Sequence, residues 1–228
     1  MTVKGKFYLE YFPRKPESFI QGGKTMNHQS GLPVITISRQ YGAGGRTVAR
    51  GLSARFDIPW YDRDFVAETA AKSGYSEDDI RKEGERLSAG GRFLNSVLNT
   101  SAAYSSSHDG IFLAQKQVIM DLSASPCIIV GRCADFILRE AKVPCFSLFL
   151  YADLPFRLKR AQQLKENGDM DLKKYVEKID RQRDTYYRNY THHSMGDFAL
   201  YDLCLNSGRI PMDENIDLIA QMIEALSR

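Results

Sequence analysis

The chain has 228 residues, of which 43% are hydrophobic and 11% aromatic, enough to bury one sizeable core with attached lids rather than two independent domains. Its 31 Lys and Arg residues against 28 Asp and Glu residues leave a formal net charge of +3, which is too small for a general binder of nucleic acids or membrane surfaces. A site for a phosphorylated ligand would therefore need cationic side chains gathered at one place.

No stretch approaches the roughly 18 apolar residues of a membrane span, and the first residues lack the long apolar segment of a secretory signal. We therefore expect a cytoplasmic protein without a membrane or nucleic-acid partner, present as a monomer or homodimer. The cysteines lie in or beside apolar runs, without a CxxC pair or a His at metal-ligand spacing, and predict reduced core thiols rather than a metal site. They are Cys127, Cys133, Cys145 and Cys204.

Residues 1–32 mix aromatic residues, Pro, Gly and polar residues without a period, and predict a peripheral N-terminal arm, with disorder as one interpretation. Two origins of this segment stay open. Translation starting at Met26 would remove most of it, whereas a genuine arm would pack on a partner.

From Val34 onward, apolar runs alternate with amphipathic stretches, which is typical of an α/β fold with a buried parallel sheet. The predicted strands are Val34–Ser38, a short strand ending near Tyr61, Cys127–Gly131, Cys145–Tyr151 and Leu203–Asn206. Helical spacing of apolar residues predicts three core-facing stripes: Val48, Ala49, Leu52 and Phe56; Leu172, Val176 and Ile179; and Ile216, Ile219, Ile223 and Leu226. Between about Ser73 and Ser107 the chain becomes charged and then rich in Gly, Asn and Ser, which predicts a mobile insert.

A glycine-rich turn, Gly42-Ala43-Gly44-Gly45, separates the first strand from a helix that begins near Arg46. Glycine permits positive φ and close approach of backbone N–H groups, and a helix N-terminus adds the positive end of its dipole. The segment therefore predicts an anion cradle, although a tight strand-to-helix turn requires the same glycines. Thr47 fits a phosphate or magnesium contact and fits helix capping equally well.

This loop resembles the phosphate loop of the cytidylate kinase-like family, and further motifs extend the resemblance over roughly residues 34–226. The resemblance implies an α/β, P-loop NTPase-type three-layer fold with a five-stranded parallel sheet. It also implies a kinase domain over residues 33–228, with a helical acceptor-side insert at about 62–122 and a helical lid at about 157–195. ATP is implied as phosphoryl donor and Mg²⁺ as its metal.

The resemblance places the donor phosphates on the loop, which comprises Gly42, Ala43, Gly44, Gly45, Arg46 and Thr47. Cytidylate kinases carry a lysine where this chain has Gly45, so the usual point charge on the phosphates is missing. Arg46 is the natural replacement. Arg39, just after the first strand, is a second candidate cation and is explained equally well as a solvated turn residue.

Two residues at strand ends match the family's acceptor side. Asp62, in IPWYDRDFV, is implied to orient the acceptor or bind magnesium through water, and the alternative is a helix N-cap. Arg132 follows the third clear strand, at the edge where parallel sheets bind ligands, and matches the family's Gly-Arg-Asp run; the alternative is a surface cation. Cys133 replaces the Asp of that run and the nearest carboxylate is Asp135, which weakens a prediction of cytosine specificity.

Arginines gather in the predicted lid, where the resemblance implies that they close over the donor and acceptor phosphates. Arg157 and Arg160 are implied to be catalytic, and Asp180 with Arg183 matches the family's D-x-x-R element. The alternative for this last pair is a helical salt bridge worth about 0.2–0.5 kcal/mol. Val176 stands where cytidylate kinases carry another arginine, and Arg181 is a candidate for that role.

The expected activity is in-line transfer of the γ-phosphoryl group of ATP to a nucleoside monophosphate, with CMP or dCMP as acceptor. Catalysis is assigned to Arg46, Arg157, Arg160 and Arg183, and acceptor binding to Asp62, Arg132, Asp180 and Arg183. Two alternatives stay open: a kinase of another small molecule, which the Cys133 departure favours, and a noncatalytic nucleotide-binding regulator, which the missing lysine favours. Five aromatic residues after the predicted lid arginines fit packing of the lid better than base stacking, and they predict no zinc site: Tyr186, Tyr187, Tyr190, His192 and His193.

Overall fold

The computed structural model describes residues 31–62 and 107–227. Most of the predicted N-terminal arm, and nearly all of the predicted insert between Ser73 and Ser107, lie outside the described residues. Within them, no helix is long and apolar enough to cross a membrane.

Five parallel strands form one sheet with the order β2-β3-β1-β4-β5. They are β1 (Val34–Arg39), β2 (Trp60–Tyr61), β3 (Ile128–Val130), β4 (Cys145–Tyr151) and β5 (Leu203–Asn206). Strands β4 and β5 have the predicted bounds, β1 is one residue longer, and β3 is one residue shorter at each end. The predicted five-stranded parallel sheet is confirmed.

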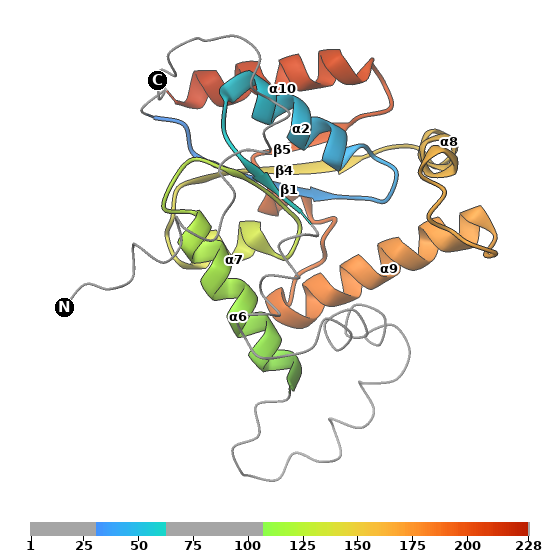
Figure 1. Ribbon diagram of the computed structural model, residues 1–228, viewed down its shortest axis with the longest axis horizontal. Helices are drawn as coiled ribbons and strands as arrows, with labels where there is room; N and C mark the ends of the chain where they lie inside the picture. The colour runs from blue at the N-terminus through green and yellow to red at the C-terminus, as the bar shows by residue number, and fades with distance from the viewer. Residues whose placement is uncertain (1–30, 63–106, 228) are drawn as a thin grey trace, which may run out of the picture. The chain divides into compact units, whose positions relative to one another are not determined.

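Helices cover both faces of this sheet, which gives the three layers predicted (Figure 1). The helices of the described residues are α2 (Gly45–Phe56), α6 (Ser107–Leu122), α7 (Ala134–Glu140), α8 (Leu154–Leu164), α9 (Leu172–Thr191) and α10 (Met212–Leu226), with a short 3₁₀ turn at Phe198–Leu200. Helices α2 and α10 lie together over one face. Helix α7 packs on the other face, beside α6 and α9.

The main core lies between the sheet and the α2–α10 layer. Apolar side chains of β1, β3 and β4 meet the predicted stripe of α2, whose Val48, Ala49 and Leu52 are fully buried. Helix α10 approaches α2 closely at Gly51, because a Cβ there would lie only 2.4 Å from Cδ1 of Ile216.

The predicted stripe of α10 is correct except at its end. Ile219 and Ile223 are fully buried, whereas Leu226 is 64% exposed. Leu226 is the last residue of the helix, and the helical period continues past the point where the core stops. All four cysteines are free, but only Cys127 and Cys133 are fully buried, so the prediction of four core thiols was wrong in part.

The carboxyl ends of the strands form the functional edge. Strand β1 is central, with β3 and β4 on either side. The segments that follow β1, β2, β3, β4 and β5 therefore leave the sheet at the same edge, where open parallel sheets bind ligands. The glycine-rich turn, Asp62, Arg132 and the start of α8 all follow these strand ends.

Replacement of Ile219 by Ala should lower the free energy of unfolding by about 2–5 kcal/mol, because it leaves a cavity in the main core. Leu226→Ala, on the same helix but at an exposed position, should change it by less than about 0.5 kcal/mol. Urea unfolding followed by circular dichroism measures both. Equal losses in the two variants would contradict the core assignment.

Candidate active site

The glycine-rich turn after β1 has the backbone of an anion cradle. Gly42 and Gly44 have φ values of 81° and 90°, a conformation that glycine adopts without strain. A Cβ at Gly42 would also lie 2.5 Å from the backbone oxygen of Arg157. Helix α2 begins at Gly45, so its first N–H groups have no partner within the helix and carry the positive end of the helix dipole. The turn therefore suits a phosphate group.

Asp180 and Arg157 bind this turn on the side away from the cavity. Asp180 Oδ1 accepts a hydrogen bond from the backbone N–H of Tyr41 at 2.6 Å, and Oδ2 forms an ion pair with the Arg157 guanidinium. Arg157 donates to the backbone oxygens of Tyr41, at 3.2 Å, and of Ala152, at 3.0 Å. Both residues were predicted to touch substrate, yet neither lines the cavity, and their bonds fix the conformation of the turn.

A buried Ser–Asn pair fixes the other side of the turn. Ser207 Oγ donates to the backbone oxygen of Ala43 at 2.7 Å. Asn215, at the start of α10, donates to the backbone oxygens of Ser207, Ile210 and Pro211, each at 3.1 Å. Sequence reasoning missed this pair, because a Ser after a strand and an Asn in a first helical turn are ordinary residues at such positions.

A cavity of about 730 Å³ opens beside the turn and is strongly cationic. Among the described residues, six cationic side chains line it against two carboxylates, so this part of the cavity fits a ligand with several negative charges. The cations are Arg39, Arg46, Arg132, Arg160, Lys178 and Arg183, and the carboxylates are Asp62 and Glu166. A volume of this size also falls in the range of small-molecule sites.

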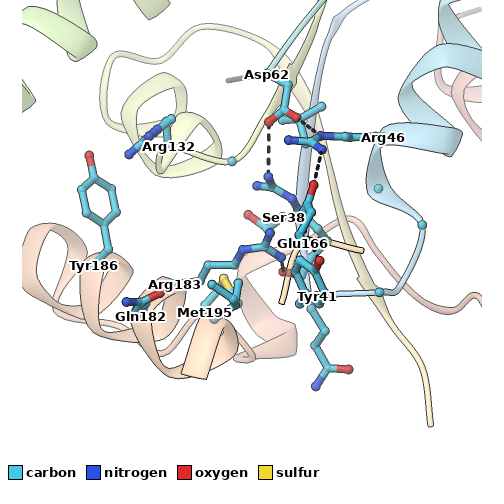
Figure 2. Close-up of a pocket in the computed structure, with 18 of the residues that line it drawn as sticks. Ser38, Tyr41, Arg46, Asp62, Arg132, Glu166, Gln182, Arg183, Tyr186 and Met195 are labelled. Carbon is cyan, nitrogen blue, oxygen red and sulfur yellow. Dashed lines mark hydrogen bonds and ion pairs between the residues drawn. The ribbon is translucent and has the colours of Figure 1, made fainter. Parts of the chain in front are cut away.

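Each of the two carboxylates of the cavity accepts hydrogen bonds from two side chains. Asp62 accepts from Arg39 at 3.3 Å through Oδ1 and from Arg46 through Oδ2 (Figure 2). Glu166, in the segment between α8 and α9, accepts from Arg46 at 3.4 Å and from the Tyr41 hydroxyl at 2.8 Å. Glu166 belongs to no recognisable motif, so its role could not be predicted from the sequence.

Burial and neighbouring charge act differently on the two arginines that share Asp62. Burial, together with the charge of Arg183, lowers the pKa of Arg39 to about 9, and Asp62 offsets only part of this effect. Burial also acts to lower the pKa of Arg46, but Asp62 and Glu166 raise it above its ordinary value. Arg46 is therefore well neutralised and Arg39 is not.

Two further arginines, one on α8 and one on α9, contact the segment around the turn. Arg160 donates to the Thr47 hydroxyl at 2.9 Å, so Thr47 lines the cavity rather than capping α2. Arg183 donates to the backbone oxygen of Arg39 at 3.2 Å and lies 5.5 Å from the centre of the Tyr41 ring. Burial lowers the pKa of both Arg160 and Arg183.

Helix α9 carries the D-x-x-R element, and its Asp180 and Arg183 bind different groups. Asp180 bonds to Tyr41 and Arg157, while Arg183 bonds to Arg39, and the two residues form no direct ion pair in the described part of the chain. Arg181 is 69% exposed and pairs with Glu177 at 3.9 Å, away from the cavity.

Arg132 enters the cavity from a sharply bent turn after β3. Gly131, Arg132 and Cys133 have φ values of 83°, 60° and 55°, three consecutive left-handed residues. The Arg132 guanidinium lies 5.6 Å from the centre of the Tyr186 ring, a cation–π distance, and Figure 2 shows the two on the side of the cavity away from Arg46. Arg132 is therefore separate from the Asp62 cluster.

The carboxylate nearest to Arg132 in sequence faces the core. Asp135 is buried in the first turn of α7 and accepts from the Tyr187 hydroxyl at 2.6 Å. Burial raises its pKa. Asp135 does not line the cavity, whereas Cys133 does, so within residues 31–62 and 107–227 the position of the Asp in the family's Gly-Arg-Asp run is filled by a thiol.

The aromatic residues between Tyr186 and His193 lie in different environments. Tyr190 stacks on Phe112 with ring centres 3.9 Å apart, and the exposed His192 ends α9. Tyr186 and Tyr187 line the cavity. No group of three or more His, Cys, Asp or Glu side chains suited to a metal occurs in residues 31–62 and 107–227.

A family model described as cytidylate kinase-like matches residues 34–209 of this chain. The chain belongs to the cytidylate kinase-like family. It is 27% identical over 196 residues to the cytidylate kinase of Thermoplasma acidophilum, covering 85% of this chain and 94% of that relative. Membership in this family confirms the prediction that the chain is a phosphotransferase, a kinase that acts on a nucleotide or another small molecule.

Solved structures show the same fold. An uncharacterized protein from Eubacterium ventriosum superposes with a TM-score of 0.62 at 24% identity, covering 85% of this chain and 99% of that one. A shikimate kinase from Bacteroides thetaiotaomicron superposes with a TM-score of 0.52 at 11% identity, covering 86% and 98%. At these identities the likeness concerns the fold alone.

Asp180→Asn should lower the free energy of unfolding by about 1.5–3 kcal/mol, because it removes the charge that the Arg157 guanidinium meets in a half-buried site. Glu177→Gln, one turn earlier on the same helix, removes only an exposed pair and should cost less than about 0.5 kcal/mol. Chemical denaturation at neutral pH measures both. Identical stability of the Asp180 variant and the unmodified chain would show that Asp180 does not hold the turn.

Proposed function

We propose that this chain transfers the γ-phosphoryl group of ATP to the phosphate of a nucleoside monophosphate, with CMP or dCMP as the preferred acceptor. The observation that carries the proposal is the cationic cavity beside the glycine turn at the start of α2, to which the described residues contribute six cations and two carboxylates. Family membership supplies the reaction class, and the cavity supplies charge for two phosphorylated ligands.

In the proposed complex, the N–H groups at the start of α2 bind the donor phosphates, and Arg46, Arg160 and Arg183 surround the transferred group. All three arginines line the cavity and approach the turn from α2, α8 and α9. Ala43 has a different role, because its carbonyl is held by Ser207. Arg157 and Asp180 act as positioning residues through their bonds to the turn.

The transfer breaks the bond between the γ-phosphorus and the oxygen that bridges it to the β-phosphate. A new bond forms to an oxygen of the acceptor phosphate, and the products are ADP and a nucleoside diphosphate. A phosphate oxygen that is already ionised needs no base, so the protein contributes position and positive charge. Fixed guanidinium groups in a half-buried cavity suit that task, because they need little reorganisation during the reaction.

Mg²⁺ fits this site as a companion of the donor phosphates. Mg²⁺ takes hard oxygen ligands and is usually held by one or two carboxylates together with substrate phosphates. Asp62 is the carboxylate that would hold it, directly or through water, and the Thr47 hydroxyl lines the same cavity. Such an ion neutralises charge on the transferred phosphate.

The acceptor side is proposed around Arg132 and Tyr186, where a guanidinium lies over an aromatic ring and Cys133 completes the wall. Cys133 in the place of the family's Asp favours a second candidate, a kinase of a different small acceptor. The two candidates share the donor half of the cavity and differ in this half.

A coupled ADP-release assay with ATP and CMP, dCMP, UMP, AMP or GMP should show the fastest turnover with CMP or dCMP. Turnover with a different member of the panel would support the second candidate. Absence of turnover with every member, while ATP still binds, would refute the nucleotide-kinase proposal and support a nucleotide-binding regulator.

Arg132→Met should raise the KM for the acceptor about 10- to 100-fold and leave the KM for ATP unchanged, because it removes one charged hydrogen-bond donor from the acceptor side. Arg181→Met is the matched control, since Arg181 is 69% exposed and outside the cavity. Steady-state kinetics with each substrate varied in turn separates the two constants. A rise in the KM for ATP alone would move Arg132 to the donor side.

A further inference from the structure

Gly45 stands where cytidylate kinases carry the loop lysine, and its backbone conformation does not explain the glycine. Gly42 and Gly44 need glycine because their φ values are positive, whereas Gly45 is an ordinary first residue of helix α2. Any amino acid adopts the backbone conformation of a first helical residue without strain, so another constraint must act at this position.

The constraint is the side chain of Arg39. A Cβ added at Gly45 would lie 2.9 Å from Cγ of Arg39, 3.3 Å from its Cδ and 3.4 Å from its Cβ. The stem of Arg39 therefore occupies the space that a side chain at residue 45 would need. A lysine at this position and Arg39 in its present place exclude one another.

The far end of Arg39 reaches a second glycine. A Cβ at Gly131 would lie 2.1 Å from Nη1 of Arg39, and the φ of Gly131 is 83°. The side chain thus extends from the first turn of α2 to the end of β3, along the carboxyl edge of the sheet. Its guanidinium lines the cavity between the donor and acceptor halves.

Within the described part of the chain, Arg39 is surrounded by more positive than negative charge. Its side chain is 16% exposed, and among the described residues its carboxylate partner is Asp62, at 3.3 Å, which also binds Arg46. Arg183, Arg132 and Arg46 all act on Arg39 as like charges. A polyphosphate in the cavity would supply the missing negative charge.

Arg46 is placed differently from Arg39, although it directly follows the glycines. Its side chain is 41% exposed and is neutralised by two carboxylates, Asp62 and Glu166. Its first contacts are therefore with protein groups.

We propose that Arg39, entering from the end of β1, takes the place of the missing loop lysine and binds the donor phosphates, and that Gly45 is glycine because Arg39 fills its side-chain space. Arg39 forms and breaks no covalent bond; it binds phosphate oxygens through its guanidinium. This inference rests on the proposed use of ATP as phosphoryl donor.

The test compares Arg39→Met with Arg46→Met, because methionine keeps the apolar stem and removes the charge. Arg39→Met should weaken ATP binding in isothermal titration calorimetry about 100-fold or more and lower kcat/KM for ATP by at least as much. Arg46→Met should weaken ATP binding less. Circular dichroism and thermal unfolding check that both variants fold.

An exchange of positions gives a second, independent readout. Gly45→Lys alone should impair ATP binding, since the new side chain meets the stem of Arg39. Arg39→Ala combined with Gly45→Lys should bind ATP at least about tenfold more tightly than Arg39→Ala alone, because the lysine then has both space and a role. A double variant no better than Arg39→Ala would overturn the proposal.

Other outcomes are equally decisive. ATP affinity of Arg39→Met within twofold of the unmodified chain, with a large loss in Arg46→Met, would assign the lysine's role to Arg46. If the unmodified chain binds ATP but phosphorylates none of the acceptors, the proposed function fails, and calorimetry on the same variants still decides the role of Arg39. Absence of ATP binding by the unmodified chain would overturn both proposals.

Discussion

Uncompensated positive charge is the constraint on which the whole cavity depends. In the described part of the chain six cations face two carboxylates there, and two like unit charges 4 Å apart repel by about 4 kcal/mol at an effective dielectric constant near 20. The fold keeps the arginines near one another by anchoring them individually: Arg183 to a backbone oxygen, Arg160 to a hydroxyl, and Arg46 to two carboxylates. A bound polyphosphate would reduce this repulsion. The repulsion that destabilises the unliganded protein therefore also raises its affinity for anions.

Anchoring of the arginines would achieve little if the turn itself could move. Its backbone is fixed at Tyr41 by Asp180 and Arg157, and at Ala43 by Ser207, through groups that the cavity does not expose. These bonds connect the turn to α9, α8 and the β5–α10 segment, which lie 116 or more positions from the turn in the sequence. Donor N–H groups held in this way need no rearrangement when a phosphate arrives, which is the condition for electrostatic catalysis. The α8–α9 region thus supports the turn as well as covering it.

Much of the fold could be predicted from local pattern, because a buried parallel strand is a short apolar run between polar turns. Cys145–Tyr151 has the predicted bounds for this reason. Leu226 shows the limit, since helical spacing does not say where the core ends. At the site, family motifs singled out the glycine turn and most of the cationic residues, yet gave no contacts. Asp180 was expected at a ligand, but its oxygens bind Tyr41 and Arg157, and only the folded chain brings residues 139 positions apart together.

The relation between Arg39, Gly45 and Gly131 belongs to this nonlocal class and bears on how a loop without lysine should be interpreted. Each residue alone has an ordinary explanation: a strand-end cation, a turn glycine and a glycine with positive φ. Together they describe one side chain lying across two positions that have no side chain of their own. A guanidinium arriving from the strand offers a planar fork to phosphate oxygens instead of a point charge, so it demands a more defined geometry than lysine. Absence of the lysine is then no argument against phosphoryl transfer, because the space that the lysine would use is already occupied by a cation.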